Sequence, residues 1–154
     1  MIIGVLKEPA AETRVSLLPE HVTILKKWNV DVYIESNAGV TAFANDEKYA
    51  ETGASVKSRN EVLIGSDILL SINPLSQSET GNLKSKTLLG VYQPLFNSGL
   101  MKELAEKGLT VFSMDMLPRT TRAQSMDILS SQANIAGYKA VLLAANLFPK
   151  YFPM

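Results

Sequence analysis

The sequence contains no cysteine, and this absence excludes disulfide bonds and thiolate metal sites. Its single histidine, His21, has no second metal-ligating side chain at helical spacing, so we expect it on the surface. Fifteen lysines and arginines balance fifteen aspartates and glutamates, which excludes the strongly basic surface that binds nucleic acid or anionic membranes. No run of residues reaches the roughly 18 consecutive apolar positions of a membrane-spanning helix. The sequence is therefore typical of a globular α/β or mixed domain.

Two nucleotide-binding motifs are also absent from these 154 residues. There is no G-x-G-x-x-G, the strand–turn–helix motif that holds the pyrophosphate of a dinucleotide, and there is no P-loop. The usual cradle for a dinucleotide pyrophosphate is therefore absent from this sequence.

Short apolar runs alternate with helical patterns along the chain. The runs predict strands over residues 2–6, 30–34, 54–56, 68–72, 87–92 and 109–114. Helices are predicted from Pro19, with Val22, Leu25 and Trp28 at a spacing of three, and over residues 46–52, 59–64 and 100–107. This alternation predicts parallel β/α units with right-handed crossovers. The fold class is therefore α/β, a three-layer domain with a parallel sheet of the Rossmann-like or flavodoxin-like kind.

The last predicted helix, Ile135 to Phe148, is apolar nearly all round. Lys139 and Asn146 are its strongly polar residues. A helix of this composition must be buried on most of its surface. Two explanations stay open, and both can hold: dimerisation, or packing against a following domain that these residues do not include.

A charged segment follows the first predicted strand and contains Lys7, Glu8, Glu12 and Arg14. Ligands of parallel α/β sheets bind outside the carboxyl ends of the strands, where this segment lies. A solvated loop with local ion pairs is the alternative interpretation. The sequence alone leaves both open.

The most polar segment runs from Pro118 to Tyr138, PRTTRAQSMDILSSQANIAGY, directly before the apolar helix. Arg119, Gln124, Asp127 and Ser130 offer hydrogen-bond donors and acceptors that match a carboxamide and a ribose. We hypothesise that this segment holds the nicotinamide end of a cofactor. A polar surface connection with capping serines is the alternative.

Two motifs resemble a known family. Lys7-Glu8 followed by Glu12-Thr13-Arg14-Val15 resembles the N-terminal signature shared by alanine dehydrogenase and proton-translocating nicotinamide nucleotide transhydrogenase. The stretch from Met114 to Val141 resembles the transhydrogenase branch closely. The resemblance implies that residues 1–133 form the N-terminal α/β domain of the family. Residues 134–154 would then form a long apolar helix leading to a second, glycine-fingerprint NAD-binding half that these residues lack.

The resemblance also implies an activity and its partners. The chain would be part of the NAD(H)-binding α subunit, which transfers hydride between NAD and an NADP held by another subunit or domain. It would form a homodimer, associate with the membrane and NADP-binding domains or subunits, and lie peripherally on the cytoplasmic side of the inner membrane. The isolated chain is expected to be inactive and to bind NAD poorly.

Motif matching assigns roles to five residues. Arg119, Asp127 and Ser130 would orient the nicotinamide carboxamide and its ribose, and Gln124 would lie near the second nucleotide. Tyr138 would lie on the closing side of the cleft. None of them is expected to act as an acid or base, because hydride transfer between two nicotinamides moves no proton at the reacting carbons.

Two other functions are compatible with parts of the sequence. The alanine dehydrogenase branch expects a lysine after the strand at 68–72 and a histidine after the next. The sequence has Ser71-Ile72-Asn73-Pro74 and Tyr92-Gln93-Pro94 at those places, which disfavours an amino-acid dehydrogenase. Arg14 is common to both branches and does not discriminate. The other alternative is a non-catalytic α/β module that dimerises through its apolar helix.

Overall fold

The computed structural model describes residues 1–150. Its contacts divide the chain into two compact units, Met1–Ser113 and a second unit that begins at Met114. Each unit is described by itself. The boundary that the sequence predicts between residues 133 and 134 stays a prediction.

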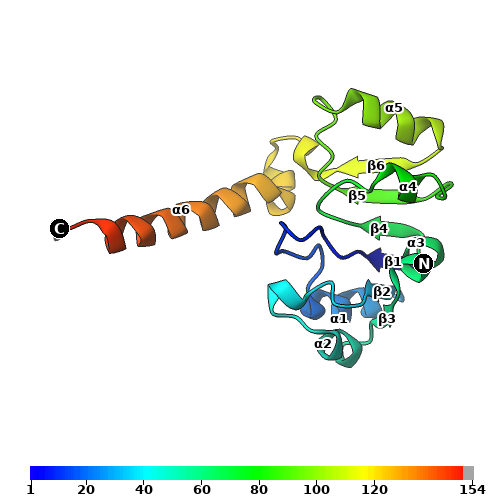
Figure 1. Cartoon of the computed structure of the whole chain (residues 1–154), viewed down its shortest axis with the longest axis horizontal. Coiled ribbons are helices and arrows are strands. Elements are labelled where there is room, and N and C mark those ends of the chain that lie inside the picture. Colours follow the sequence, from blue (N-terminus) through cyan, green and yellow to red (C-terminus); the bar gives the residue numbers. More distant parts are fainter. Residues whose placement is uncertain (151–154) are drawn as a thin grey trace. The chain divides into compact units, whose positions relative to one another are not determined.

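The first unit is a parallel sheet with helices between its strands (Figure 1). The strands are β1 (Ile2–Val5), β2 (Asp31–Glu35), β3 (Ser55–Lys57), β4 (Ile68–Leu70), β5 (Thr87–Gly90) and β6 (Thr110–Ser113). The α-helices are α1 (Pro19–Lys27), α2 (Asp46–Glu51), α3 (Arg59–Gly65), α4 (Gln77–Thr80) and α5 (Ser98–Glu106), with a 3-10 turn η1 at Val40–Ala42. All neighbouring strands pair in parallel, in the order β3-β2-β1-β4-β5-β6.

Side chains alternate between two hydrophobic cores, one on each face of this sheet. In β1, Ile3 and Val5 join the core that α1 and α2 close, with Val22 and Tyr49 fully buried. The other core holds Leu6 and is closed by α3 and α5. A strand covered on both faces must be apolar throughout, which explains the continuous apolar runs of the sequence. The expected three-layer α/β fold is confirmed.

The strand order places a topological switch point between β1 and β4. From β1 the chain builds outward through β2 and β3, then returns to the other side of β1 and continues through β4, β5 and β6. This is the Rossmann order rather than the flavodoxin order. Crossover connections leave in opposite directions at this point, so the carboxyl ends of β1 and β4 are the usual place for a ligand.

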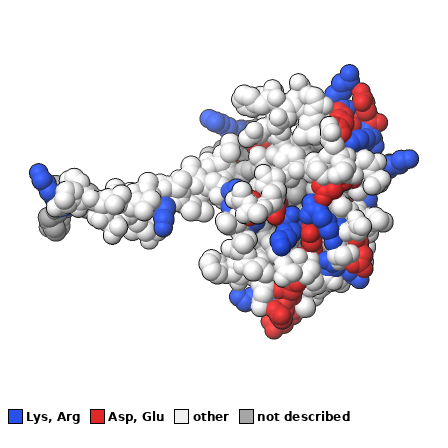
Figure 2. Space-filling view, viewed as in Figure 1, with Lys and Arg blue, Asp and Glu red and all other residues white. Residues whose placement is uncertain are grey.

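Up to residue 150, the second unit contains two 3-10 helices and one long α-helix. They are η2 (Met114–Met116), η3 (Thr121–Met126) and α6 (Ile128–Leu147). α6 has 20 residues, and none of them is buried within the described chain. Lys139 is its single charged residue, so its surface is almost free of charge in Figure 2, whereas acidic and basic side chains intermingle over the sheet unit. Among residues 1–150, no helix combines the length and apolarity needed to cross a membrane.

The structure corrects the prediction for the first helix. Trp28 does not continue the buried stripe of Val22 and Leu25; it ends α1 and its side chain is 70% exposed. The next residue, Asn29, has a φ of 57°, so the chain leaves the helix there and the helical spacing does not extend past Trp28. The sequence analysis also missed α4, whose four residues are too few for a periodic pattern. Its signal was the capping box formed by Ser76 and Glu79.

A second correction concerns the last helix. α6 begins at Ile128, seven residues before the predicted start at Ile135. The segment Pro118–Tyr138 is therefore not one loop, because its second half is helical and its first half contains η3. The polar residues Ser130, Ser131 and Gln132 hid this helical start, since serine in a helix interior is a weak helix former. The capping residue Asp127 marks the true start.

Candidate functional site

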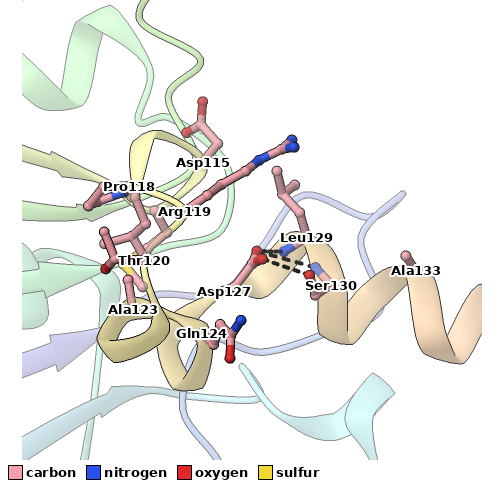
Figure 3. A pocket seen from close by; sticks show the side chains of 12 residues that line it. Asp115, Pro118, Arg119, Thr120, Ala123, Gln124, Asp127, Leu129, Ser130 and Ala133 are labelled. Carbon is pink, nitrogen blue, oxygen red and sulfur yellow. Dashed lines mark hydrogen bonds between the residues drawn. The ribbon is translucent and has the colours of Figure 1, made fainter.

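The second unit contains a pocket of about 470 Å³ whose lining comes entirely from residues between Met114 and Ala133 (Figure 3). Four of the five residues expected from the sequence line it: Arg119, Gln124, Asp127 and Ser130. Tyr138 is not among the lining residues and lies further along α6, where its side chain is 71% exposed. Within this unit the pocket thus brings together the expected polar residues without Tyr138.

Asp127 is the N-cap of α6. Its Oδ1 accepts hydrogen bonds from the backbone N–H groups of Leu129 (2.9 Å) and Ser130 (3.2 Å), and its Oδ2 accepts one from Ser130 Oγ (2.6 Å). These bonds form because the first N–H groups of a helix have no partner inside the helix. The Ser130 hydroxyl bond, followed by the backbone bonds and the charge of Arg119, lowers the pKa of Asp127. The carboxylate is therefore ionised and fixed against the first turn of α6.

This bond determines what Ser130 can offer a ligand. A hydroxyl has one proton to donate and two lone pairs, and Ser130 donates its proton to Asp127. The lone pairs of Ser130 Oγ remain as acceptors. Dashed lines in Figure 3 join the two residues at the start of the helix. A group that binds Ser130 without breaking this bond must be a donor, such as an amide NH₂ or a sugar hydroxyl.

Arg119 and Gln124 supply the complementary groups. Both side chains are exposed at the pocket, one as a fixed array of N–H donors and the other as an amide that donates and accepts. Asp115, Thr120 and Ala133 also line the pocket and were not among the expected residues. Asp115 had a usable signal: it is the second residue after β6, and ligand-binding residues often follow the carboxyl ends of parallel strands.

Acid should weaken the start of α6 through Asp127. A carboxylate with a lowered pKa stabilises the folded turn above its ordinary pKa near 4, and the contribution is lost as pH falls through the lowered value. We expect the backbone amide signals of Leu129 and Ser130 to titrate with a midpoint below pH 4 in NMR spectra. Asp127→Asn retains a good capping residue without the charge, so it should abolish this titration. An unchanged midpoint in that variant would contradict the assignment.

The charged segment after β1 separates into two parts. Arg14 and Glu12 form a local ion pair, with Nη2 2.6 Å from Oε2, and the hydrogen bond from Arg14 lowers the pKa of Glu12 to about 2. This part matches the alternative of a loop with local ion pairs. Glu8 is different, because it is buried and its carboxylate reaches the segment that follows β4.

A second cluster of ion pairs holds the backbone of Lys7, which follows β1. Arg59, the first residue of α3, contacts Glu35 at 2.7 Å and Glu79 at 2.5 Å, and it donates to the backbone oxygen of Lys7. The Lys7 N–H in turn donates to Glu35. These groups satisfy one another, which is typical of a structural clamp. Among residues 1–150, no three histidine, cysteine or acidic side chains are grouped to hold a metal ion.

A parallel sheet in the order β3-β2-β1-β4-β5-β6, with helices between its strands, places the chain among the Rossmann-like α/β domains. The family model described as "Alanine dehydrogenase/PNT, N-terminal domain" matches residues 4–136. The chain belongs to this family.

The more similar relatives are transhydrogenase subunits, and alanine dehydrogenases are more distant. The chain is 40% identical over 143 residues to NAD(P) transhydrogenase subunit alpha of Cereibacter sphaeroides, covering 92% of this chain and 27% of that protein. A solved transhydrogenase from Sinorhizobium meliloti is similar over the whole chain and 47% of its own, with a TM-score of 0.91 and 36% identity. Alanine dehydrogenase of Staphylococcus saprophyticus is more distant, at 27% identity over 98% of this chain and 41% of that protein. The chain thus spans less than half the length of these relatives.

Proposed function

We propose that this chain is part of the NAD(H)-binding component of a proton-translocating transhydrogenase, in which hydride passes between NAD(H) and NADP(H). The observation that carries the proposal is the pocket in which Asp127 fixes Ser130 beside Arg119 and Gln124. The names of the more similar relatives, which are transhydrogenase α subunits, support it.

The donors and acceptors of the pocket fit a nicotinamide. Ser130 Oγ offers lone pairs to the carboxamide NH₂ or a ribose hydroxyl, and Arg119 offers N–H donors to the carboxamide oxygen. When bound, the cofactor supplies or accepts the hydride. The task of the chain is to hold the ring in one orientation, since hydride transfer requires reacting carbons about 3–3.5 Å apart. No residue is required as a base, because no proton leaves the reacting carbons.

The remaining partners follow from the same proposal. NADP is held by another subunit or domain, near Gln124. The exposed apolar surface of α6 packs against a second NAD-binding half, and Tyr138 on that helix lies on the closing side of the cleft. The assembly is a homodimer, attached peripherally to membrane and NADP-binding domains on the cytoplasmic side of the inner membrane. What supports the packing of α6 is its exposure, with Ile135, Val141 and Leu147 each more than 60% exposed in the chain alone.

A non-catalytic dimerisation module is the second candidate, favoured by the same exposed helix. The two candidate functions differ in whether the pocket binds a cofactor. If the chain only mediates association, Arg119→Ala and Ser130→Ala leave cofactor binding and hydride transfer by the assembly unchanged. An amino-acid dehydrogenase is not favoured, because alanine dehydrogenases are the more distant relatives and the expected lysine and histidine are absent.

The 154-residue chain alone should bind NAD weakly, with a dissociation constant of about 1 mM or higher, equivalent to roughly 4 kcal/mol. The reason is that its sequence has no glycine-rich motif for the pyrophosphate. A chimera that joins it to the remaining residues of the Cereibacter sphaeroides subunit should bind NADH in the micromolar range. Titration calorimetry and NADH fluorescence measure both. Micromolar affinity of the chain alone, or none in a folded chimera, would count against the proposal.

A further inference from the structure

Glu8 is a buried carboxylate that the proposed function does not use. Glu8 is 8% exposed, although it lies three residues after β1, beyond the carboxyl edge of the sheet, where charged side chains normally reach water. An ionised carboxylate is costly to bury unless hydrogen bonds replace its hydration. Its surroundings must therefore supply those bonds.

The segment after β4 supplies three donors. The N–H of Ile72 donates to Glu8 Oε1 at 2.5 Å, and the N–H of Asn73 donates to Oε2 at 3.0 Å. The side-chain Nδ2 of Asn73 adds a third bond to Oε2, also at 3.0 Å. These three donors, here called the nest, converge on one carboxylate, as successive backbone N–H groups do in many anion-binding sites. Each carboxylate oxygen of Glu8 is bound by this nest as a ligand would be.

The charge around the nest also suits an anion. The pKa of Arg14 is raised, chiefly by its hydrogen bond with Glu12 and in smaller part by the charges of Glu12 and Glu8. The direct partner of the Arg14 guanidinium is Glu12, and the negative charge of Glu8 adds to the same effect. A positive charge near convergent N–H groups strengthens the preference for a bound carboxylate.

The position of the nest in the sheet is the third observation. Glu8 follows β1, while Ile72 and Asn73 follow β4, and these two strands are neighbours. The switch point of the sheet lies between them. In open α/β sheets a ligand binds in the crevice at this point. Here a side chain of the protein itself occupies the corresponding donors.

We propose that Glu8 is an internal ligand of a carboxylate-binding nest at the switch point, and that removing its side chain opens this nest to a free small carboxylate. With Glu8 in place, the donors of Ile72 and Asn73 are occupied, and the native chain takes no external carboxylate there. The class of ligand follows from Glu8 itself: a monocarboxylate the size of acetate. This inference concerns the sheet unit and does not depend on nicotinamide binding.

The test is the thermal unfolding of the 154-residue chain in sodium acetate and in sodium chloride at equal ionic strength. Glu8→Ala deletes one methylene and the carboxylate, and acetate can replace these atoms. In chloride the variant should unfold about 5–10 °C below the native chain, because it leaves buried N–H groups without partners. In 0.2 M acetate it should regain at least half of that loss.

Three controls make the rescue specific. Glu8→Gln keeps the nest filled, so acetate should add no more stability than chloride, and the native chain should behave in the same way. Benzoate has the same charge but is too large, and it should not rescue Glu8→Ala. Glu51→Ala removes an exposed carboxylate and should show neither the loss nor the rescue.

NMR spectra give a second measurement at the site itself. In Glu8→Ala, added acetate should shift the amide signals of Ile72 and Asn73, and these signals should not move in the native chain. If Glu8→Ala does not fold in chloride, acetate should restore the folded spectrum. Equal stabilisation of the native chain and Glu8→Ala by acetate, or a variant that stays unfolded in both salts, would overturn the proposal.

Discussion

Replacing Ser130 by alanine should lower the rate of hydride transfer by about 100-fold while changing NADH affinity only a few-fold. The variant removes the acceptor that Asp127 holds in place by the 2.6 Å bond to Ser130 Oγ. A nicotinamide that has lost this contact stays bound through the rest of the cofactor but samples orientations in which the reacting carbons are too far apart. The expected loss therefore falls on the chemical step, which stopped-flow measurements on the chimeric subunit would separate from binding.

The neighbouring residue provides a matched control. Ser131 Oγ bonds back to the main-chain oxygens of Asp127 (3.0 Å) and Ile128 (3.3 Å), and Ser131 does not line the pocket. Ser131→Ala should leave the transfer rate within about two-fold of the native value, because a back-bonded serine contributes little to a helix. Equal rate losses in the two variants would mean that the start of α6 matters only for folding.

Arg119 allows a parallel comparison. Arg119→Ala should also slow hydride transfer, since it removes donors at the pocket, whereas Arg122 lies outside the lining and Arg122→Ala should not. Loss of affinity without loss of rate in Arg119→Ala would assign this arginine to binding alone.

Gly90→Ala should be among the most destabilising single substitutions in the sheet unit, lowering the free energy of unfolding by about 3 kcal/mol. A Cβ atom at Gly90 would lie 2.2 Å from the main-chain oxygen of Ser71, at the carboxyl ends of β5 and β4. The two backbone segments cannot easily move apart, because both are held in the sheet. The Ser71 N–H donates to the Leu89 oxygen, and Gly90 pairs with Ser113 in β6. Urea unfolding monitored by circular dichroism measures the change.

Gly99 is the control for this substitution. It lies in the first turn of α5, and a Cβ atom there would meet nothing within 4 Å. Gly99→Ala should raise the stability by up to about 1 kcal/mol, because alanine is the better helix former. A small effect of Gly90→Ala, similar in size to that of Gly99→Ala, would show that the edge between β4 and β5 relaxes more easily than its hydrogen bonds indicate.

The middle of the sheet was predictable because β1, β4 and β5 are largely covered on both faces and so appear as nearly uninterrupted apolar runs. β1, β2 and β5 lie within runs identified from the sequence alone, apart from a residue or so at their ends. The strand order was not predictable in this way. Periodicity does not say which strand lies beside β1, and both the Rossmann and the flavodoxin orders suit the same runs.

The sequence predicted which polar residues line the pocket, but it did not predict how they are arranged. Arg119, Gln124, Asp127 and Ser130 were identified by their density of polar groups and by a family resemblance. The role of Asp127 as a helix cap was hidden, since α6 was expected to start later. Glu8 was also ambiguous, because sequence spacing does not show that a glutamate after one strand will bind the backbone after another.

The start of α6 at Asp127 has a mechanical consequence. A helix of 20 residues is a stiff rod of about 30 Å, and Ser130 sits in its first turn. A domain or subunit that binds the far end of α6 would tilt the helix about its first turn, which Asp127 caps. Small tilts of α6 would change the direction of Ser130 Oγ while Asp127 keeps its hydrogen bonds to the first turn. The apolar length of α6 would then transmit the position of whatever packs against it to Ser130 in its first turn.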